Sequence, residues 1–261
     1  MGVAVLVLLT DFGVSGPYIG QVKAVLAQRA PSVPVIDLFH DLPVFEPVLA
    51  AALIPSYCES PFPKGAVFLC VVDPGVGTSR QALVMSSRGF WYVGPDNGLL
   101  SRIVDDDPQA QIWSLDWFPE TASATFHARD IFAPAAAALA CGYTPGPTCR
   151  APLVATIVGS DDIIRCSAGM GQAVWQKVVY IDHYGNAMTG MRGGEIDNQD
   201  TLEVGGYLLR RQRTFGMGES GVPFWYINSN GLVELAVRNG SIASAFGIVP
   251  GMPVFVRSGL S

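Results

Sequence analysis

The feature that most constrains the fold is a change of pattern along the chain. In about the first 140 residues, short apolar runs alternate with segments whose apolar residues recur at helical spacing. Beyond about Gly169 the apolar runs are short and strand-like, and glycines separate them. The first pattern predicts a mostly parallel sheet with helices on both faces. The second predicts a smaller antiparallel, barrel-like β domain.

We therefore expect an α/β chain with a Rossmann-like N-terminal domain over residues 1–158 and a C-terminal β domain over residues 168–261. A turn-rich stretch at residues 143–147 would end the first unit. In the first unit, the patterns predict strands at 3–9, 33–39, 66–72, 82–86 and 90–93, and helices at 18–29, 47–57, from 96 and at 130–140. In the second unit, they predict strands at 175–182, 201–204, 207–209, 231–237 and 254–256.

Charge and cysteine usage exclude several classes of function. The net charge of -6, without a lysine or arginine cluster, argues against nucleic acid and anionic membranes as partners. The opening run VAVLVLL is too short to span a bilayer and no basic residue precedes it, so we expect a strand and not a signal peptide. Five cysteines without a CxxC pair suggest reduced thiols in a cytoplasmic protein. Three histidines without ligand spacing suggest no metal site.

Three polar residues lie in two short loop segments. Asp73 and Arg80 belong to VVDPGVGTSR, which continues an apolar run typical of a buried strand, and His127 belongs to TFHARDIFAP. Open α/β sheets place ligands where their strands end. A carboxylate, a guanidinium and an imidazole there can hold and polarise a water molecule. The alternative is a turn aspartate, a surface arginine and a core histidine.

Two further segments carry groups suited to a nucleoside ligand. Asp11 ends the first predicted strand, where a carboxylate can accept both hydroxyls of a ribose; the alternative is a turn or helix-capping aspartate. In the segment 182–186, Asp182 can hold an ammonium group, Tyr184 can stack on a purine and Asn186 can bond its edge. The alternative is an ordinary hairpin turn, and this alternative is stronger still for Asn228-Ser229-Asn230-Gly231, which precedes Glu234.

In order along the chain, these motifs resemble the S-adenosyl-L-methionine (SAM) hydroxide adenosyltransferase family, the SAM hydrolases, which are relatives of the fluorinase and chlorinase. The match covers nearly the whole chain. Each motif is modest alone, and the set is specific. The matching segments are TDFG (10–13), DLFHDLPVFEP (37–47), VVDPGVG (71–77), VGPDNGLLS (93–101), TFHARDIFAP (125–134), IDHYGN (181–186) and YINSNGLVELAV (226–237).

The resemblance implies that water displaces methionine from the 5′ carbon of SAM, giving adenosine and L-methionine, with SAM as substrate and no cofactor. It also implies a homotrimer with sites between subunits, each formed by the N-terminal domain of one and the C-terminal domain of the next. Asp73, Arg80 and His127 match the family's catalytic triad, and Asp11 matches its ribose-binding aspartate. The remaining implied contacts are an aromatic against the ligand at Phe45, and methionine and adenine contacts at Asp182, Tyr184, Asn186 and Ser229.

Two other functions remain as alternatives: a non-catalytic adenosine- or SAM-binding protein, and a SAM-dependent halogenase. In the halogenases an uncharged residue stands at the position of Asp73, and a small polar residue follows the position of His127. Here a carboxylate would repel a halide, and Ala128 offers no hydroxyl to it. Ala128 also replaces the family's usual glycine, the first loop lacks an acid near Gly16, and Asn230 replaces an arginine of the fluorinase. The last two changes affect contacts to the methionine end of the ligand.

Overall fold

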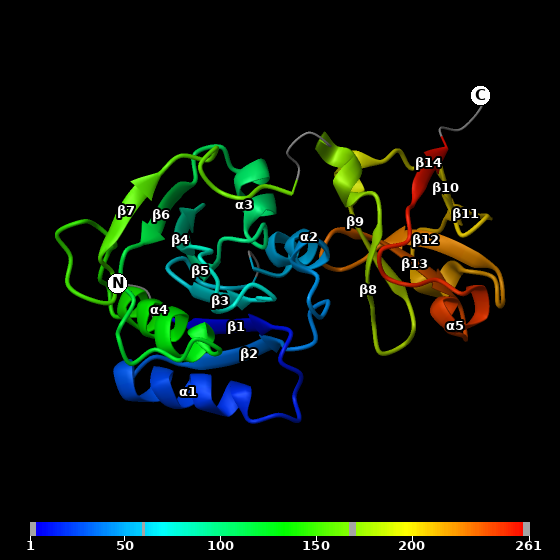
Figure 1. Cartoon of the computed structure of the whole chain (residues 1–261). Coiled ribbons are helices and arrows are strands. Elements are labelled where there is room, and N and C mark those ends of the chain that lie inside the picture. Colours follow the sequence, from blue (N-terminus) through cyan, green and yellow to red (C-terminus); the bar gives the residue numbers. More distant parts are fainter. Residues whose placement is uncertain (1–3, 59–60, 167–170, 258–261) are drawn as a thin grey trace. The chain divides into compact units, whose positions relative to one another are not determined.

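The computed structural model describes residues 4–58, 61–166 and 171–257 (Figure 1). The chain divides into two compact units, Met1–Cys166 and Ser167–Ser261, each built around its own seven-stranded sheet. The predicted start of the second domain at residue 168 lies outside the described residues. None of the helices in the described part has the length and apolar run that a membrane crossing requires.

The first unit has a mixed sheet in the order β2-β1-β3-β5-β4-β6-β7. Its first four strands pair in parallel, whereas β4, β6 and β7 join by antiparallel pairings. The expectation of a mostly parallel sheet is therefore wrong for half of the described pairings. The strands are β1 (Leu6–Thr10), β2 (Val35–Phe39), β3 (Val67–Val71), β4 (Ala82–Ser87), β5 (Phe90–Pro95), β6 (Gln111–Leu115) and β7 (Ala155–Val158).

A tight turn explains the change of direction in this sheet. Arg88 and Gly89 both have positive φ angles, 49° and 82°, as a two-residue hairpin turn requires, so β4 and β5 run antiparallel. The sequence predicted this bend, but gave no sign of the distant pairing of β6 with β7. Tertiary contact alone brings those two segments together.

Both faces of the sheet are covered. Leu6 and Leu8 of β1 belong to the core formed with α1 and α4, while Val7 and Leu9, which alternate with them, are also fully buried. Figure 1 shows α1 and α4 on one side of the sheet and α2 and α3 on the other. The helices are α1 (Tyr18–Arg29), α2 (Pro47–Cys58), α3 (Ser101–Asp106), the π-helix η1 (Ala128–Phe132) and α4 (Ala133–Ala140).

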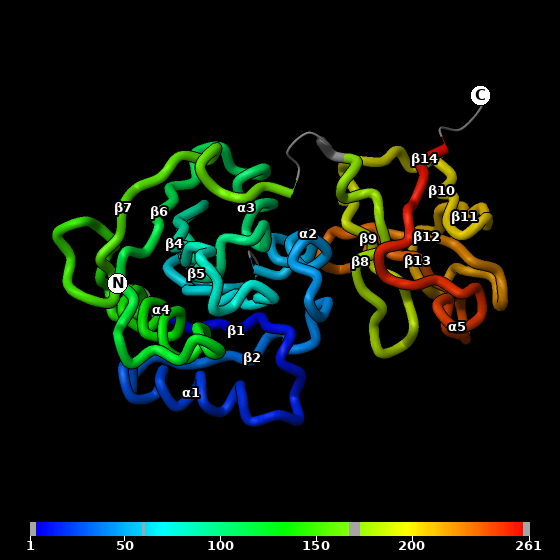
Figure 2. Tube along the Cα trace, in the orientation of Figure 1, coloured from blue at the N-terminus to red at the C-terminus, as the bar shows by residue number. Residues whose placement is uncertain are grey.

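Helix positions differ from expectation at two points. The helix expected from Asp96 begins at Ser101, because Asn97 accepts a hydrogen bond from the backbone N–H of Leu99 and so forms a turn (3.2 Å). The helix expected at 130–140 is a π-helical turn, η1, continued by α4. The Cα tube shows α4 next to α1 (Figure 2).

The second unit is a sheet in the order β14-β10-β11-β12-β13-β9-β8, antiparallel except for the short parallel pairing of β11 with β12. Backbone hydrogen bonds from Val178 N to Met252 O and from Val254 N to Gln176 O, both 2.9 Å, link the segments next to β8 and β14. Its strands are β8 (Val178–Ile181), β9 (Ala187–Arg192), β10 (Thr201–Val204), β11 (Tyr207–Arg211), β12 (Pro223–Ile227), β13 (Leu232–Val237) and β14 (Phe255–Arg257). Short helices are η2 (Gly171–Trp175), η3 (Gly193–Glu195), η4 (Phe215–Met217) and α5 (Ile242–Phe246).

Candidate active site

Two of the predicted carboxylates lie at the carboxyl ends of neighbouring parallel strands. Thr10, the last residue of β1, pairs with Val71, the last residue of β3. Asp11 follows directly and donates its backbone N–H to Val71 O at 3.2 Å, while Asp73 lies two residues beyond β3. Because parallel strands end at the same edge, both carboxylates stand at the position where open α/β sheets bind ligands.

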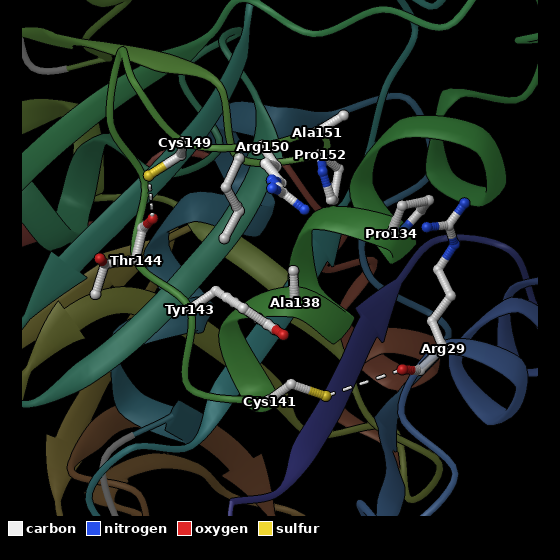
Figure 3. Close-up of a pocket in the computed structure, with 11 residues that line it drawn as sticks. Arg29, Pro134, Ala138, Cys141, Tyr143, Thr144, Cys149, Arg150, Ala151 and Pro152 are labelled. Atoms are coloured by element: carbon white, nitrogen blue, oxygen red, sulfur yellow. Dashed lines mark hydrogen bonds between the residues drawn. The ribbon is translucent and has the colours of Figure 1, made fainter.

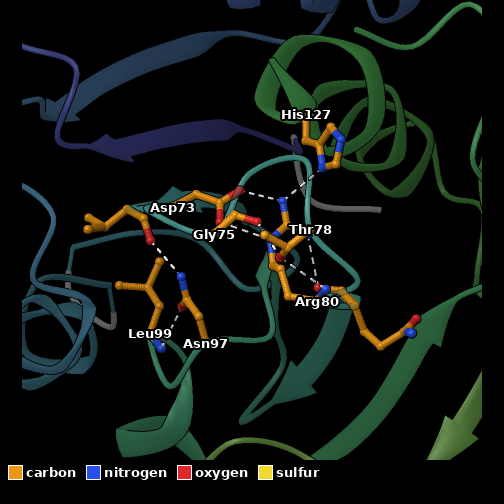
Figure 4. Close-up of polar contacts among 9 residues, drawn as sticks. Asp73, Gly75, Thr78, Arg80, Asn97, Leu99 and His127 are labelled. Atoms are coloured by element: carbon orange, nitrogen blue, oxygen red, sulfur yellow. Dashed lines mark hydrogen bonds and ion pairs between the residues drawn. The ribbon is translucent and has the colours of Figure 1, made fainter. Parts of the chain in front are cut away.

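Arg80 holds the Asp73 carboxylate with two hydrogen bonds (Figure 4). Its Nε donates to Oδ1 at 2.8 Å and its Nη2 donates to Oδ2. The two side chains are only 7% and 6% exposed, so little water competes for this pair. A paired guanidinium fixes the carboxylate in orientation as well as in position. Asp73 does begin a turn, in which its carbonyl oxygen accepts from Val76 N–H, but its carboxylate is buried against Arg80, which is therefore not a surface arginine.

His127 joins the same network. Arg80 Nη2 lies 2.9 Å from His127 Nδ1 (Figure 4). A guanidinium can only donate, so Nδ1 must accept, and the ring proton of the neutral imidazole must be on Nε2. Burial and the neighbouring Arg80 lower the pKa of His127 below its usual 6.5, which favours this neutral form. His127 also precedes η1, and π-helical turns are frequent at functional sites.

A glycine allows the two loops to approach each other. Gly77 has a φ of 80°, and a Cβ at this position would lie 2.5 Å from the backbone oxygen of Ala124, near His127. No other residue type fits this space without moving one loop. On the other side, Asn97 Nδ2 donates to Val72 O at 2.9 Å and so ties down the chain next to Asp73. Sequence reasoning gave Asn97 no role, although it lies in the matching segment VGPDNGLLS.

A cavity of about 350 Å³ lies against this network. Asp11, Phe45, Asp73 and His127 line it, whereas Arg80 does not and lies behind Asp73. Apolar and aromatic side chains complete the wall, with Phe12, Tyr18 and Phe126 in mutual ring contact at 5.4–6.0 Å between centroids. His127 is therefore a buried histidine that still faces a cavity.

Phe45 and Asp11 are linked at the rim of this cavity. The backbone N–H of Phe45 lies 3.3 Å from Asp11 Oδ2, and the Phe45 side chain is 71% exposed. Phe45 adopts a φ of 61°, a conformation that costs a non-glycine residue of the order of 1 kcal/mol. Burial raises the pKa of Asp11, and the negative charge of nearby Asp73 adds to this effect. Asp11 is thus not a helix cap but a partly desolvated carboxylate facing the cavity.

The other predicted residues gather in the second unit, around a cavity of about 800 Å³. Asp182, Tyr184, Asn186 and Ser229 all line it. Asp182 Oδ1 accepts the backbone N–H groups of Tyr184 and Asn186 at 2.9 and 2.8 Å, so this carboxylate orders its own turn. Its other oxygen, Oδ2, has only a long contact of 3.3 Å to Asn186 Nδ2. The segment is both a turn and part of a cavity wall.

Glu234 supports the turn that begins at Asn228 and forms part of the wall of this cavity. It is 3% exposed, and its two oxygens accept from the Tyr226 hydroxyl and, at 2.8 Å, from Asn228 Nδ2. Asn228 Oδ1 in turn accepts the backbone N–H groups of Asn230 and Leu232, both at 3.0 Å. Burial and Glu234 raise the pKa of Tyr226, which stays protonated and able to donate. From the sequence Tyr226 had no predicted role at the site and Asn228 was interpreted only as part of a turn, although both lie in the matching segment YINSNGLVELAV.

Within the described residues, no three histidine, cysteine, aspartate or glutamate side chains gather as a metal ion would require. The first cavity offers two carboxylates, one of them held by an arginine, and a neutral imidazole. Such a set can orient a water molecule and bind hydroxyl groups. The second cavity offers carboxylate, amide, hydroxyl and aromatic groups, which suit an amine and a heterocyclic base.

Comparison with known proteins links the two cavities to one family. Residues 6–147 match the family model of the SAM hydroxide adenosyltransferase N-terminal domain, and residues 176–255 match that of its C-terminal domain. A protein of Thermus thermophilus named (R)-S-adenosyl-L-methionine hydrolase is 40% identical, covering 94% of this chain and 96% of its own. A protein of the same name from Salinispora arenicola is 31% identical, with 96% of both chains covered. A fluorinase of an Actinoplanes species is 24% identical, with 98% of both covered.

Solved structures agree in fold. A conserved hypothetical protein from Thermus thermophilus has a TM-score of 0.76 and 36% identity, covering 97% of this chain and 100% of its own. An uncharacterized conserved protein from Thermotoga maritima has a TM-score of 0.80 and 29% identity, covering 96% and 99%.

Proposed function

The chain belongs to the SAM hydroxide adenosyltransferase family, and from this premise we propose how it hydrolyses SAM to adenosine and L-methionine. The observation that carries the proposal is the network in which Arg80 holds both Asp73 and His127 beside a cavity. A protein that only bound adenosine would need ribose and base contacts, but no such network.

The reaction needs an oriented water molecule more than it needs acid catalysis. The water oxygen forms a bond to the 5′ carbon, the bond from that carbon to sulfur breaks, and its electron pair stays on the sulfur of methionine. The leaving group is a neutral thioether and requires no proton. The attacking water must lie in line with sulfur, about 3 Å from the carbon. No cofactor is required for this displacement.

In this proposal Asp73 and His127 hold that water. Both oxygens of Asp73 accept from Arg80, and each oxygen retains capacity for a further hydrogen bond from water. The His127 tautomer set by Arg80 leaves Nε2–H as a donor towards the water oxygen. Water oriented by one acceptor and one donor exposes a lone pair to the carbon, and Asp73 is the nearest group to receive the proton that the water loses.

Asp11 and Phe45 would bind the nucleoside beside the reacting carbon. Asp11 lines the same cavity as Asp73 and can accept the two ribose hydroxyls. Hydroxyl donors compensate for the desolvation that raises its pKa, so bound ligand favours the ionised form. The exposed ring of Phe45 offers an apolar wall to the ligand. In the other unit, Asp182, Tyr184, Asn186 and Ser229 would contact the methionine ammonium and the adenine.

Assembly and location are part of the same proposal. We infer a homotrimer in which the first unit of one subunit and the second unit of the next share a ligand. A cytoplasmic location is supported by the five cysteines, all within the described residues, because no disulfide joins any two of them. The Rossmann-like description of the first unit is supported by ligand groups at the carboxyl edge of β1 and β3. The hydrogen bonds between the segments next to β8 and β14 support the barrel-like description of the second.

Halogenase activity has less support. The Asp73 carboxylate lines the first cavity and would repel a halide, and Ala128 offers it no hydroxyl. Incubation of the purified protein with SAM in oxygen-18 water tests the whole proposal. Mass spectrometry should show adenosine labelled at its 5′ oxygen together with unlabelled methionine. Intact SAM alongside tight adenosine binding would mean that the protein is a binding protein.

A further inference from the structure

The first unit also contains a third cavity, which lies apart from the Asp73 network. It has a volume of about 390 Å³ and shares no lining residue with the cavity next to Asp73 (Figure 3). Arg29, in the last turn of α1, lies on its wall. Because α1 leads from the end of β1 back to the start of the parallel strand β2, its last turn lies at the opposite edge of the sheet from Asp73.

The charged groups of this cavity are all cationic. Arg29 and Arg150 line it, no aspartate or glutamate does so, and neither guanidinium forms an ion pair with any of the described residues. In Figure 3 the Arg150 side chain reaches towards the helix that carries Ala138 and Pro134, and the Arg29 side chain extends past Pro134. Two unpaired guanidiniums at one cavity favour an anion, and their forked geometry suits carboxylate and phosphate oxygens.

The remaining wall is apolar. Ala138 of α4 and the buried side chain of Leu153 form part of it, together with Pro134 and Pro152. The ring of Tyr143, 67% exposed, adds an aromatic face. Cavities of about 300–1,000 Å³ with an apolar wall and a few polar groups are typical of small-molecule sites. A bare inorganic ion would make no apolar contact with this wall, whereas a ligand with an apolar body would.

We propose that this cavity is a binding site for a small organic anion, a carboxylate or a phosphate monoester carried on an apolar body. The two arginines bind the anionic group, and Ala138, Leu153 and Tyr143 contact the body of the ligand. The site is separate from the proposed hydrolytic site and does not depend on it. Arg29 also offsets the partial negative charge at the end of α1, so its variants need a stability control.

Titration calorimetry with three probes of similar size tests the proposal: phenyl phosphate, benzoate and the uncharged benzamide. We expect at least one anion to bind once per chain and benzamide to bind at least tenfold more weakly. Binding of phenyl phosphate alone or of benzoate alone identifies the anionic group. Equal binding of benzamide, or no binding of either anion, overturns the proposal.

Variants of residues that line the cavity test whether the anion binds there. Arg29→Gln and Arg150→Gln should each weaken anion binding about tenfold, the effect of one lost charge-assisted hydrogen bond. Lys23→Gln is the matched control, because it removes the same charge from α1 outside the cavity, where Lys23 pairs with Asp37. Ala138→Phe should block binding while both arginines remain. Thermal unfolding of each variant checks that it is folded.

Two results would overturn the assignment to this cavity. The first is unchanged affinity in both arginine variants or in Ala138→Phe. The second is displacement of the anion by adenosine in competition, which would place the anion in the cavity beside Asp11 and Asp73. SAM turnover by the same variants is a separate readout, so failure of this proposal is distinguishable from failure of the proposed hydrolysis.

Discussion

Arg80 connects two functional side chains without lining the cavity itself. Its Nη2 group donates one hydrogen to Asp73 and one to His127, and Nη1 donates to Gln81 O at 3.0 Å. Its guanidinium also lies 5.0 Å from the centre of the Phe132 ring. In the proposed mechanism Arg80 is therefore a positioning residue, and the groups that touch the reacting water are Asp73 and His127.

Removing the charge of Asp73 should lower the turnover of SAM while leaving the affinity for adenosine nearly unchanged. Asp73→Asn keeps the size of the side chain, but its amide cannot accept two hydrogen bonds from Arg80 and hold water as well. We expect turnover to fall about 10²–10⁴-fold, with adenosine affinity within about threefold of the wild type, less than 1 kcal/mol. Asp116→Asn is the control, because Asp116 is exposed and its carboxylate accepts from the Thr156 hydroxyl at 2.7 Å. An equal loss of turnover and adenosine affinity would show a structural role.

The lowered pKa of His127 predicts an acid limb in the pH profile. Protonation of Nδ1 removes the acceptor for Arg80 and places a second cation beside it. Since the folded pKa lies below the usual 6.5, kcat/KM should be level at neutral pH and fall only below that value. The unfolded chain binds this proton more readily, so stability also falls in that range.

The variant His127→Asn identifies the group behind this limb. Its Oδ1 can replace Nδ1 as an acceptor and does not titrate, so the acid limb should shift or vanish, even if the rate is lower. A limb centred above pH 6.5, or the same limb in His127→Asn, would exclude His127 as its source.

Glu234 offers a matched pair of variants in the second unit. Glu234→Met removes the acceptor of Asn228 Nδ2, whereas Glu234→Gln can set its oxygen against Asn228 Nδ2 and its amide N–H against the Tyr226 hydroxyl, which can accept. In Glu234→Met, Asn228 is free to turn and to release the backbone N–H groups that order the Ser229 turn. We expect KM for SAM to rise about tenfold in this variant, the effect of one broken buried hydrogen bond, with a smaller change in kcat. Glu234→Gln should keep KM near the wild-type value; an equal rise in both variants would contradict the proposed positioning.

At the scale of elements, the loops at the strand ends depend on close backbone approach. Gly77 lets the loop 73–80 pass the backbone of Ala124, and Gly185 lets the turn 182–186 pass Ser241, where a Cβ would lie 2.0 Å from the hydroxyl oxygen. These glycines position groups that they do not touch. The π-helical turn η1 then carries the chain from His127 into the buried helix α4.

Gly77→Ala should therefore damage activity through geometry. Its methyl group would overlap a backbone oxygen that cannot rotate away, in addition to the strain of a positive φ. Gly65→Ala is the matched control, because Gly65 has a φ of 88° with nothing within 4 Å of the added Cβ. We expect both to lose about 1 kcal/mol of stability from strain, and only Gly77→Ala to lose more and to reduce turnover at least tenfold. Similar urea unfolding and turnover in both variants would show that the overlap has no effect.

At the scale of the whole molecule, the predicted site residues divide between two units that each have their own core. Asp73 and His127 line a cavity in the first, and Asp182 and Ser229 line one in the second. A reaction that needs both groups requires both units, and in the proposed trimer neighbouring subunits supply them.

Mixed trimers test this arrangement. We expect chains with Asp73→Asn and chains with Asp182→Ala each to have little activity alone, but a site shared between neighbours can take an intact first unit from one and an intact second unit from the other. Random equal mixing should restore about one quarter of wild-type activity, because each shared site draws independently on two subunits. Activity no higher than that of the separate variants would contradict sites between subunits.

Local sequence patterns predicted most of the helices, many of the strands and the chemical groups of the site, but not the strands β6, β7, β9 and β12. Helical spacing predicted α1 at its observed bounds of Tyr18–Arg29, and the apolar run ending near Asp73 predicted β3. Both predictions were possible because the spacing of apolar residues within a short segment indicates a helix or a buried strand. Of the site residues predicted from the motifs, all except Arg80 line one of the two cavities.

Which distant groups come into contact depends on the tertiary structure. The antiparallel pairing of β6 with β7, the double role of Arg80 towards Asp73 and His127, and the support of Asn228 by Glu234 have no local pattern. Arg80 and His127 are 47 residues apart, and their contact depends on the Gly77 loop and on packing of η1 in the core. Such contacts result from the fold as a whole, because burial and backbone pairing, not sequence spacing, fix the distance between segments.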